Sequence, residues 1–149
     1  MPAAIGLLPY GFDLMFLHFP SADVIGHKYG WMSNAQLNVL RDSDVELGKL
    51  LDALDEADLR KDTLIIITAD HGGHDKTHDG TLQVDYDIPW IVSGPGVIPM
   101  QLTTKVQIMD TAATAAYALE LPIPPEWDGV PVYEAFGLPI GERAEVVCP

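Results

Sequence analysis

The stretch 63–78 reads Thr-Leu-Ile-Ile-Ile-Thr-Ala-Asp-His-Gly-Gly-His-Asp-Lys-Thr-His and decides the fold class of this 149-residue sequence. Its first half is an uninterrupted apolar, β-branched run, which suits a strand buried on both faces, as in a parallel sheet. The run stops at Asp70-His71, and Gly72-Gly73 allow a sharp turn. A carboxylate and an imidazole are therefore expected at the carboxyl end of a strand, where open α/β sheets bind ligands.

The loop after this strand holds an unusual share of the histidines. His71, His74 and His78 are three of the five in the chain. A second pair, Asp23 and His27, follows another apolar segment, and a spacing of four places both side chains on one face of a helical turn. One Asp-His pair alone is more often a turn residue beside a solvated imidazole. Two such pairs at two strand ends favour a divalent-metal site over coincidence.

Composition narrows the class of protein. Hydrophobic residues make up 48% and charged residues 20% of the chain, which is typical of a globular domain. The net charge of −14 disfavours binding to nucleic acids. No apolar run approaches the ~18 residues of a membrane span, and the N-terminus lacks the pattern of a secretory signal, so the compartment stays open. Cys148 is the single cysteine, so no internal disulfide can form.

The remaining helices and strands are predicted from the spacing of apolar residues and from the capping and turn residues between them. Ser33 to Gln36 reads as a capping box that starts a helix reaching about Ala57. Asp44 lies on the leucine stripe of that helix, where a buried carboxylate needs partners. Asp110 is expected to cap a second helix. The predicted strands are 12–19, 63–69, 88–92 and 103–108. The second helix is predicted at 111–119, and residues 121–149 form a proline-rich wrapping tail. His18, within the first predicted strand, is expected to pack rather than to bind metal.

The motifs together resemble the alkaline phosphatase superfamily, most closely its type I phosphodiesterase/nucleotide pyrophosphatase and sulfatase-like branches. The resemblance covers residues 12–136. The matching motifs are, in chain order, Asp23-Val-Ile-Gly-His27-Lys-Tyr-Gly, the helix with Asp44, Ile67-Thr-Ala-Asp70-His71-Gly-Gly, His78, Ile88-Pro-Trp-Ile-Val-Ser-Gly-Pro-Gly and the tail from Leu121. It implies a three-layer open mixed sheet with helices on both faces, formed by residues 1–149 as a single α/β domain fragment.

The resemblance also implies two divalent cations, zinc or manganese by the chemistry of mixed carboxylate and imidazole ligands. The first cation would be held by Asp23, His27 and His78. The second would be held in part by Asp70 and His71. His74 is an alternative to His78 as the third ligand of the first cation, but the resemblance favours His78. His74 is then, like Asp44, a candidate for contact with substrate or for hydrogen bonding to the metal ligands.

The sequence departs from the family pattern at its N-terminal end. Family members carry a further metal-binding aspartate and a Ser or Thr nucleophile ahead of the segment matched by 12–19, and neither has a counterpart here. Asp110-Thr111 copies that arrangement superficially but is explained by helix capping. The expectation is therefore a C-terminal half, incomplete for catalysis.

The implied function is metal-dependent hydrolysis of phosphate esters, with phosphodiesters or nucleotides ahead of monoesters. A phosphoglycerate mutase-like phosphotransferase, a sulfatase acting on sulfate esters, and a non-catalytic metal-binding fragment are the alternatives. Loss of half a domain would expose a sheet edge and apolar surface, which predicts a homo-oligomer.

Overall fold

The computed structural model describes residues 1–141, and the chain forms two compact units. Unit 1 consists of Met1–Lys61 and Asp70–Ile88, and unit 2 consists of Asp62–Ala69 and the chain from Pro89 onward. The segment Asp70–Ile88, which holds the histidines of the quoted stretch, therefore belongs to the helical unit 1. Cys148 and the end of the predicted tail lie outside the described residues.

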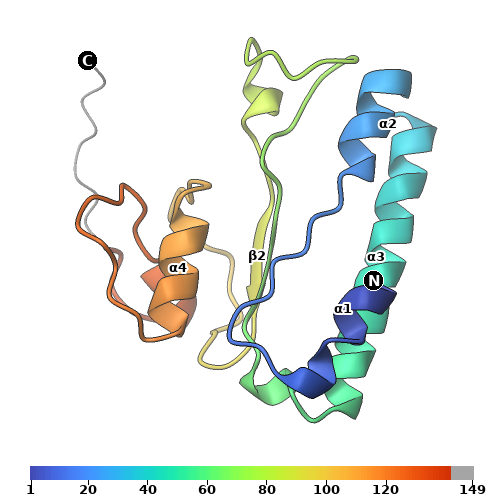
Figure 1. The fold of residues 1–149 in the computed structure, drawn as a ribbon. Helices are drawn as coiled ribbons and strands as arrows, with labels where there is room; N and C mark the ends of the chain where they lie inside the picture. The colour runs from blue at the N-terminus through green and yellow to red at the C-terminus, as the bar shows by residue number, and fades with distance from the viewer. Residues whose placement is uncertain (142–149) are drawn as a thin grey trace. The chain divides into compact units, whose positions relative to one another are not determined.

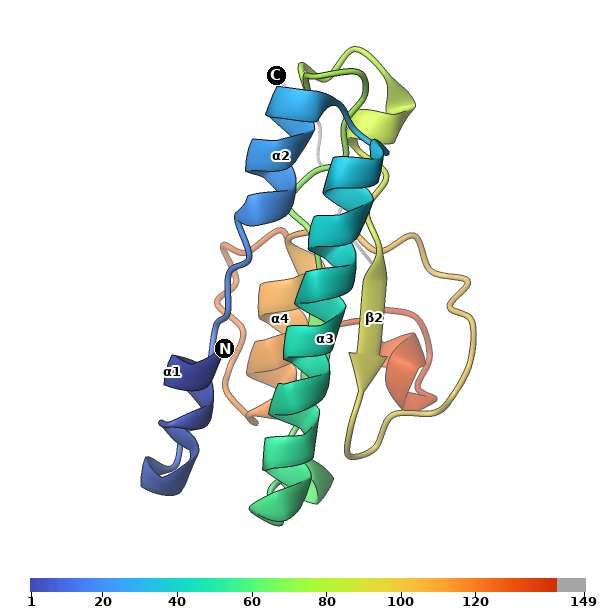
Figure 2. The ribbon, with the colours of Figure 1, turned by 90° about the vertical axis from the view of Figure 1, so that its right-hand side faces the viewer.

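Unit 1 is built on two helices that pack side by side, α2 (Ser21–Tyr29) and α3 (Asn34–Glu56), as Figures 1 and 2 show. The short α1 (Pro2–Ile5) contacts α3, and two 3₁₀ turns, η1 (Leu8–Tyr10) and η3 (Gln83–Asp85), complete the unit. Among the described residues, no helix combines the length and the apolar character that a membrane span requires.

The start of α3 confirms the predicted cap and adds a link to α2. The hydroxyl of Ser33 accepts a hydrogen bond from the Gln36 amide at 3.3 Å. The Gln36 side chain, which is 5% exposed, accepts from the Met32 amide and donates to the carbonyl of Ala22 on α2. One buried amide therefore fixes both the first turn of α3 and the position of α2 beside it. Further along α3, Asp44 is exposed to solvent.

The predicted first strand, 12–19, is wrong. The segment is extended but pairs with no strand of the described part of the chain. Leu14 is 68% and Phe16 is 86% exposed, and His18 is exposed as well. A strand is defined by the partner that satisfies its backbone groups, and here the N–H and C=O groups have no such partner among residues 1–141.

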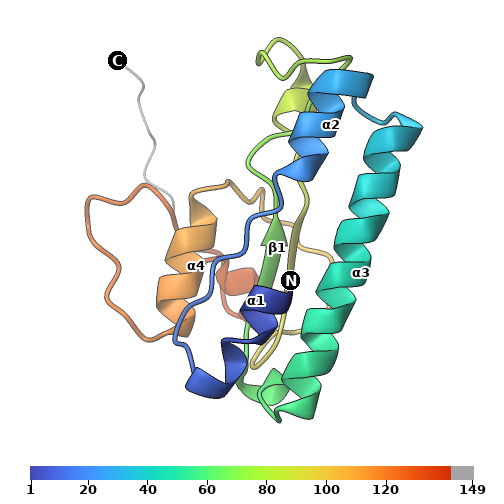
Figure 3. The ribbon, with the colours of Figure 1, turned by 45° about the vertical axis from the view of Figure 1, so that its right-hand side comes forward.

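Unit 2 contains an antiparallel strand pair, β1 (Ile65–Thr68) and β2 (Trp90–Ser93), seen in Figures 1 and 3. Thr68 pairs with Trp90, and Ile65 with Ser93. Both predicted strands are confirmed, but they pair with each other in antiparallel orientation rather than in the parallel one that the central run suggested. The central run is also not buried on both faces, since Ile67 and Thr68 are exposed. The α/β class holds, whereas the described residues form no three-layer sheet.

The C-terminal part of unit 2 surrounds α4 (Asp110–Ala118), with η4 (Tyr133–Phe136) as a 3₁₀ turn in the tail and η2 (Arg60–Asp62) ahead of β1. Asp110 is 1% exposed and is the first residue of α4 rather than its cap. Its carboxylate accepts from the amides of Gln107 and Val130, at 2.8 and 2.9 Å. It therefore ties the helix start to the tail.

The predicted strand 103–108 is also wrong, for a specific reason. The backbone amides of Thr103 and Thr104 donate to the carboxylate of Glu134, at 2.8 to 3.0 Å, and the Thr103 hydroxyl donates at 2.6 Å. The backbone amides of Thr103 and Thr104 are therefore not available to a strand partner. The four hydrogen bonds also lower the pKa of Glu134 to about 2, chiefly through the threonine donors.

Candidate metal centre

Helix α2 and the segment Asp70–Ile88 are joined within unit 1 by hydrogen bonds to a small hairpin. His74 and Thr77 pair as an antiparallel bridge around the turn Asp75-Lys76. The Trp31 amide donates to the Asp75 carbonyl at 2.7 Å, and His27 Nδ1 lies 2.9 Å from the Lys76 carbonyl. The end of α2 thus sets the position of the loop that carries the other histidines.

A single carboxylate oxygen lies at the centre of the arrangement that results. Asp23 Oδ1 is 3.4 Å from Nε2 of His27, 3.8 Å from Nε2 of His71 and 3.7 Å from Nε2 of His78. This oxygen is buried and has no hydrogen-bond partner among the described residues. A buried acceptor left without a donor costs free energy, so the arrangement calls for a partner that the protein itself does not provide.

Two of the rings are oriented to present a lone pair toward that oxygen. His27 Nδ1 faces the Lys76 carbonyl, and His71 Nδ1 lies 2.8 Å from the Gly72 carbonyl. A carbonyl only accepts, so each Nδ1 carries the proton, and the neutral ring has an unprotonated Nε2. Metal-binding histidines are commonly held in this way, with the second nitrogen donating to the backbone.

The spacing of the ligand atoms fits a divalent cation. Ligands about 2.0–2.1 Å from a tetrahedral zinc ion lie about 3.3 Å from each other. The distances of 3.4 to 3.8 Å around Asp23 Oδ1 are close to this value and are long for direct hydrogen bonds. Ligand atoms from Asp23, His71 and His78 all lie within 4.8 Å of one another. His27 lies outside this group of three, although its Nε2 is 3.4 Å from Asp23 Oδ1.

The indole of Trp31 packs against the same rings. Its centroid is 5.0 Å from that of His27 and 5.8 Å from that of His78, and the rings of His71 and His78 stack with centroids 3.8 Å apart. A Cβ on Gly73 would lie 2.2 Å from the indole. Gly73 is therefore required for the close approach of Trp31, rather than for the sharp turn expected from sequence.

Two other predicted site residues lie apart from this group. Asp70 is exposed, with 76% of its side chain accessible, although its Oδ2 is 3.7 Å from His71 Nε2 and its Oδ1 accepts from the His71 amide. Asp44 is exposed on α3 and belongs to neither group of candidate ligands found among residues 1–141. The structure thus brings His27, His71 and His78 to Asp23, whereas the sequence had assigned His71, together with Asp70, to a second cation. Asp70 Oδ2 is as close to His71 Nε2 as Asp23 Oδ1 is.

His74 faces a different carboxylate. Its Nδ1 lies 2.8 Å from Oδ1 of Asp85, which is 3% exposed. This hydrogen bond, which the Asp85 carboxylate accepts, raises the pKa of His74 and lowers the pKa of Asp85. Ligand atoms of His74, Asp79 and Asp85 all lie within 4.8 Å of one another. Sequence reasoning missed Asp85, one of 22 acidic residues, because its approach to His74 arises only through η3.

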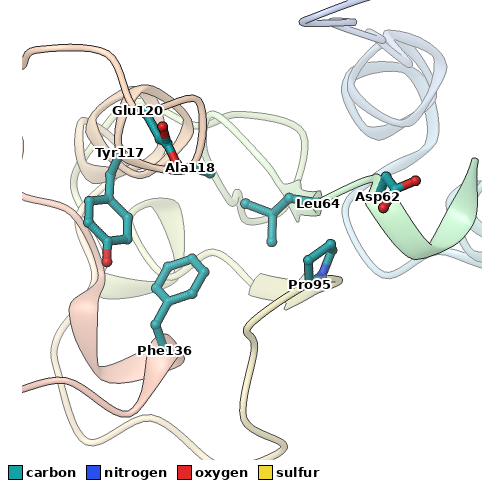
Figure 4. A pocket seen from close by; sticks show the side chains of 7 residues that line it. All are labelled: Asp62, Leu64, Pro95, Tyr117, Ala118, Glu120 and Phe136. Atoms are coloured by element: carbon teal, nitrogen blue, oxygen red, sulfur yellow. The ribbon is translucent and has the colours of Figure 1, made fainter.

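Unit 2 contains a separate concave site with a cavity volume of about 480 Å³, shown in Figure 4. The lining residues are Asp62, Leu64, Pro95, Tyr117, Ala118, Glu120 and Phe136. Its two carboxylates are exposed, and the lining contains no histidine or cysteine. This pocket therefore offers no mixed ligand set comparable with that around Asp23.

Several known proteins are similar in sequence to this chain. The 2,3-bisphosphoglycerate-independent phosphoglycerate mutase of Acaryochloris marina is 28% identical over 91% of this chain, and the alkaline phosphatase PhoK of a Sphingomonas species is 25% identical over 90%. The phosphopentomutase of Herpetosiphon aurantiacus is 34% identical over 83% of this chain. The chain spans 27%, 22% and 31% of the lengths of these relatives, respectively.

The family assignment rests on a match to a family model. No solved structure matches the chain significantly. The family model described as type I phosphodiesterase / nucleotide pyrophosphatase matches residues 3–115, which include every candidate ligand around Asp23. The chain therefore belongs to the type I phosphodiesterase/nucleotide pyrophosphatase family of the alkaline phosphatase superfamily.

Proposed function

We propose that unit 1 binds zinc or manganese and forms part of the active site of a metal-dependent phosphoric ester hydrolase. Asp23, His27 and His78 hold one cation, and Asp70 and His71 contribute to a second. The observation that carries this proposal is the buried, unpartnered Oδ1 of Asp23 facing three imidazole nitrogens. Mixed oxygen and nitrogen donors of this kind suit zinc or manganese better than calcium.

The roles of the chain's own residues follow from their contacts. Asp23 supplies an anionic oxygen, while His27 and His71 are held in the ligand tautomer by backbone carbonyls. Trp31 packs on the histidine rings and shields one side of the group. Cations bound here would polarise a phosphoryl oxygen and stabilise the leaving oxygen.

The substrate class is a small-molecule phosphate ester, with phosphodiesters or nucleotides first. Two venom phosphodiesterases of Crotalus adamanteus, 35% identical over 40% of this chain, favour a phosphodiester. A phosphotransferase is the second candidate, because two mutases match 91% and 83% of the chain. Sulfate-ester hydrolysis remains the alternative that the resemblance alone suggests.

Turnover by this chain alone is expected to be low, because none of its residues is assigned as the nucleophile. The contacts of Asp110-Thr111 support a structural role for that pair. Asp110 holds two backbone amides, and the Thr111 hydroxyl accepts from the indole of Trp90 at 3.1 Å. We further propose that the three-layer sheet of the superfamily forms only when further strands pair with those of this chain. The strand pair would otherwise support association between copies.

The direct test is native mass spectrometry of the protein supplied with zinc or manganese. We expect at least one cation per chain, and loss of a cation in Asp23→Asn and in His78→Ala. His18→Ala is the matched control, because His18 is an exposed histidine outside the candidate ligand groups. Equal metal content in all four proteins would refute the proposal.

A further inference from the structure

Asp85 connects four points of the segment Asp70–Ile88. Its Oδ1 accepts from His74 Nδ1 at 2.8 Å, and its Oδ2 accepts from the amides of Gly80 and Leu82, at 3.0 and 3.4 Å. Its backbone carbonyl accepts from the Gly72 amide at 2.8 Å. With 3% of its surface exposed, Asp85 is the buried hub of this segment.

The partners of Asp85 flank the candidate metal ligands. Gly72 directly follows His71, while Gly80 comes two residues after His78. The contact between Gly72 and the segment of Asp85 is close, since a Cβ on Gly72 would lie 1.9 Å from the carbonyl oxygen of Val84. The chain is therefore fastened on both sides of the stacked rings of His71 and His78.

His74 and Asp85 could instead be read as ligands of another cation, together with Asp79. The hydrogen bonds argue against that role. Both oxygens of Asp85 already accept from protein donors, and Asp79 Oδ1 accepts from the amide and the hydroxyl of Thr81. Both oxygens of Asp85 and one oxygen of Asp79 thus have protein donors, in contrast to the unpartnered Oδ1 of Asp23.

We propose that Asp85 is a positioning residue that holds His71 and His78 at the spacing required by the metal centre. It acts through Gly80 and His74 by its carboxylate and through Gly72 by its backbone carbonyl. This inference rests on the proposed function for its effect on metal affinity, but the positioning itself exists without a bound ion. Residues that orient ligands in this way typically change metal affinity 10–100-fold when replaced.

The test replaces only the charge of the hub. Asp85→Asn keeps the side-chain shape, while Asp87→Asn makes the same charge change two residues away, at an exposed aspartate that accepts from Gln83 Nε2. We expect zinc affinity, measured by competition with a chromogenic chelator, to fall about 10–100-fold in Asp85→Asn and to stay unchanged in Asp87→Asn. Helix content by circular dichroism checks that both variants fold.

A metal-free measurement separates this inference from the proposed function. In NMR titrations without metal, Asp85→Asn should lower the pKa of His74 and shift the ring signals of His71 and His78, whereas Asp87→Asn should leave them in place. Unchanged ring signals in Asp85→Asn would overturn the positioning role. Loss of one whole cation in that variant would also overturn it, because Asp85 would then be a ligand. Absence of zinc binding by the wild type would count against the proposed function alone.

Discussion

At the scale of single residues, the arrangement of the candidate metal ligands depends on a close fit between an aromatic ring and glycines. The indole of Trp31 lies where a side chain on Gly73 would be, with 2.2 Å between the ring and an added Cβ. An added Cβ on Gly26 of α2 would lie 3.0 Å from the same indole. Trp31 thus packs between the helix that carries Asp23 and the loop that carries His71.

Replacement of Gly73 by alanine should therefore push α2 away from the loop. We expect Gly73→Ala to lower the free energy of unfolding by about 1–3 kcal/mol, as for overpacked cores, and to weaken zinc binding. Urea unfolding followed by circular dichroism measures the first effect. Gly48→Ala is the control, because nothing lies within 4 Å of an added Cβ on this α3 residue. Gly48→Ala should be at least as stable as the wild type, because alanine favours a helix more than glycine does. The prediction fails if Gly73→Ala is as stable as the wild type.

At the scale of elements, the buried carboxylate of Glu134 binds backbone amides of the segment 103–108 in unit 2 that was predicted to be a strand. Glu134 on η4 accepts hydrogen bonds from Thr103 and Thr104, and these donors lower its pKa from 4.5 to about 2. An acid whose pKa is lower in the folded state stabilises the fold when ionised. Its contribution is complete above pH 4.5 and is lost as the pH falls toward 2.

Replacement of Glu134 by glutamine should therefore destabilise unit 2 in a pH-dependent way. The difference in Tm between wild type and Glu134→Gln is expected to be largest above pH 5 and to shrink as the pH is lowered toward 2. Thermal melts across this range measure it. As a control, Glu126→Gln removes an exposed carboxylate from the same unit. A Tm difference that stays constant with pH would contradict this assignment.

The sequence predicted correctly those elements that depend on residues close together in the chain. The start of α3 depends on Ser33 and Gln36, three residues apart, and the spacing of Asp23 and His27 fits one face of α2. Strand direction depends instead on which segment pairs with which, so the parallel arrangement of the central run was wrong. The segment 12–19 has the composition of a strand, but pairing cannot be read from composition.

The same distinction holds for the candidate site. The cluster of histidines after β1 indicated candidate ligands, and the family resemblance favoured His78, whose Nε2 lies 3.7 Å from Asp23 Oδ1. The role of His74 could not be predicted, because it depends on Asp85, eleven residues further along the chain. Asp44 was expected to be buried on the leucine stripe of α3. It is exposed, because that stripe is only partly covered by the rest of the protein.

At the scale of the whole molecule, exposed apolar side chains favour association between chains, whereas the negative net charge opposes it. Each strand of the pair β1-β2 has only one neighbouring strand among the described residues, and Ile91 on β2 is 55% exposed. Such edges promote association between chains. The net charge of −14 opposes association, and salt screens that repulsion.

The protein is therefore expected to form dimers or larger oligomers, more strongly at 0.5 M than at 0.05 M NaCl. Light scattering coupled to size-exclusion chromatography measures the mass directly. Ile91→Lys should favour the monomer by placing a charge on the strand, whereas Leu40→Lys, at a 46% exposed position on α3, should not. A monomer at high concentration and high salt would exclude association through this edge.

The contact between Trp31 and Gly73 also links two positions in evolution. A side chain at position 73 is compatible with this packing only if residue 31 becomes smaller, and a smaller residue 31 leaves a gap beside His27 and His78. Neither change is neutral alone, so a lineage would have to accept both in close succession. Homologues are expected to retain the tryptophan and the glycine together or to have replaced them together.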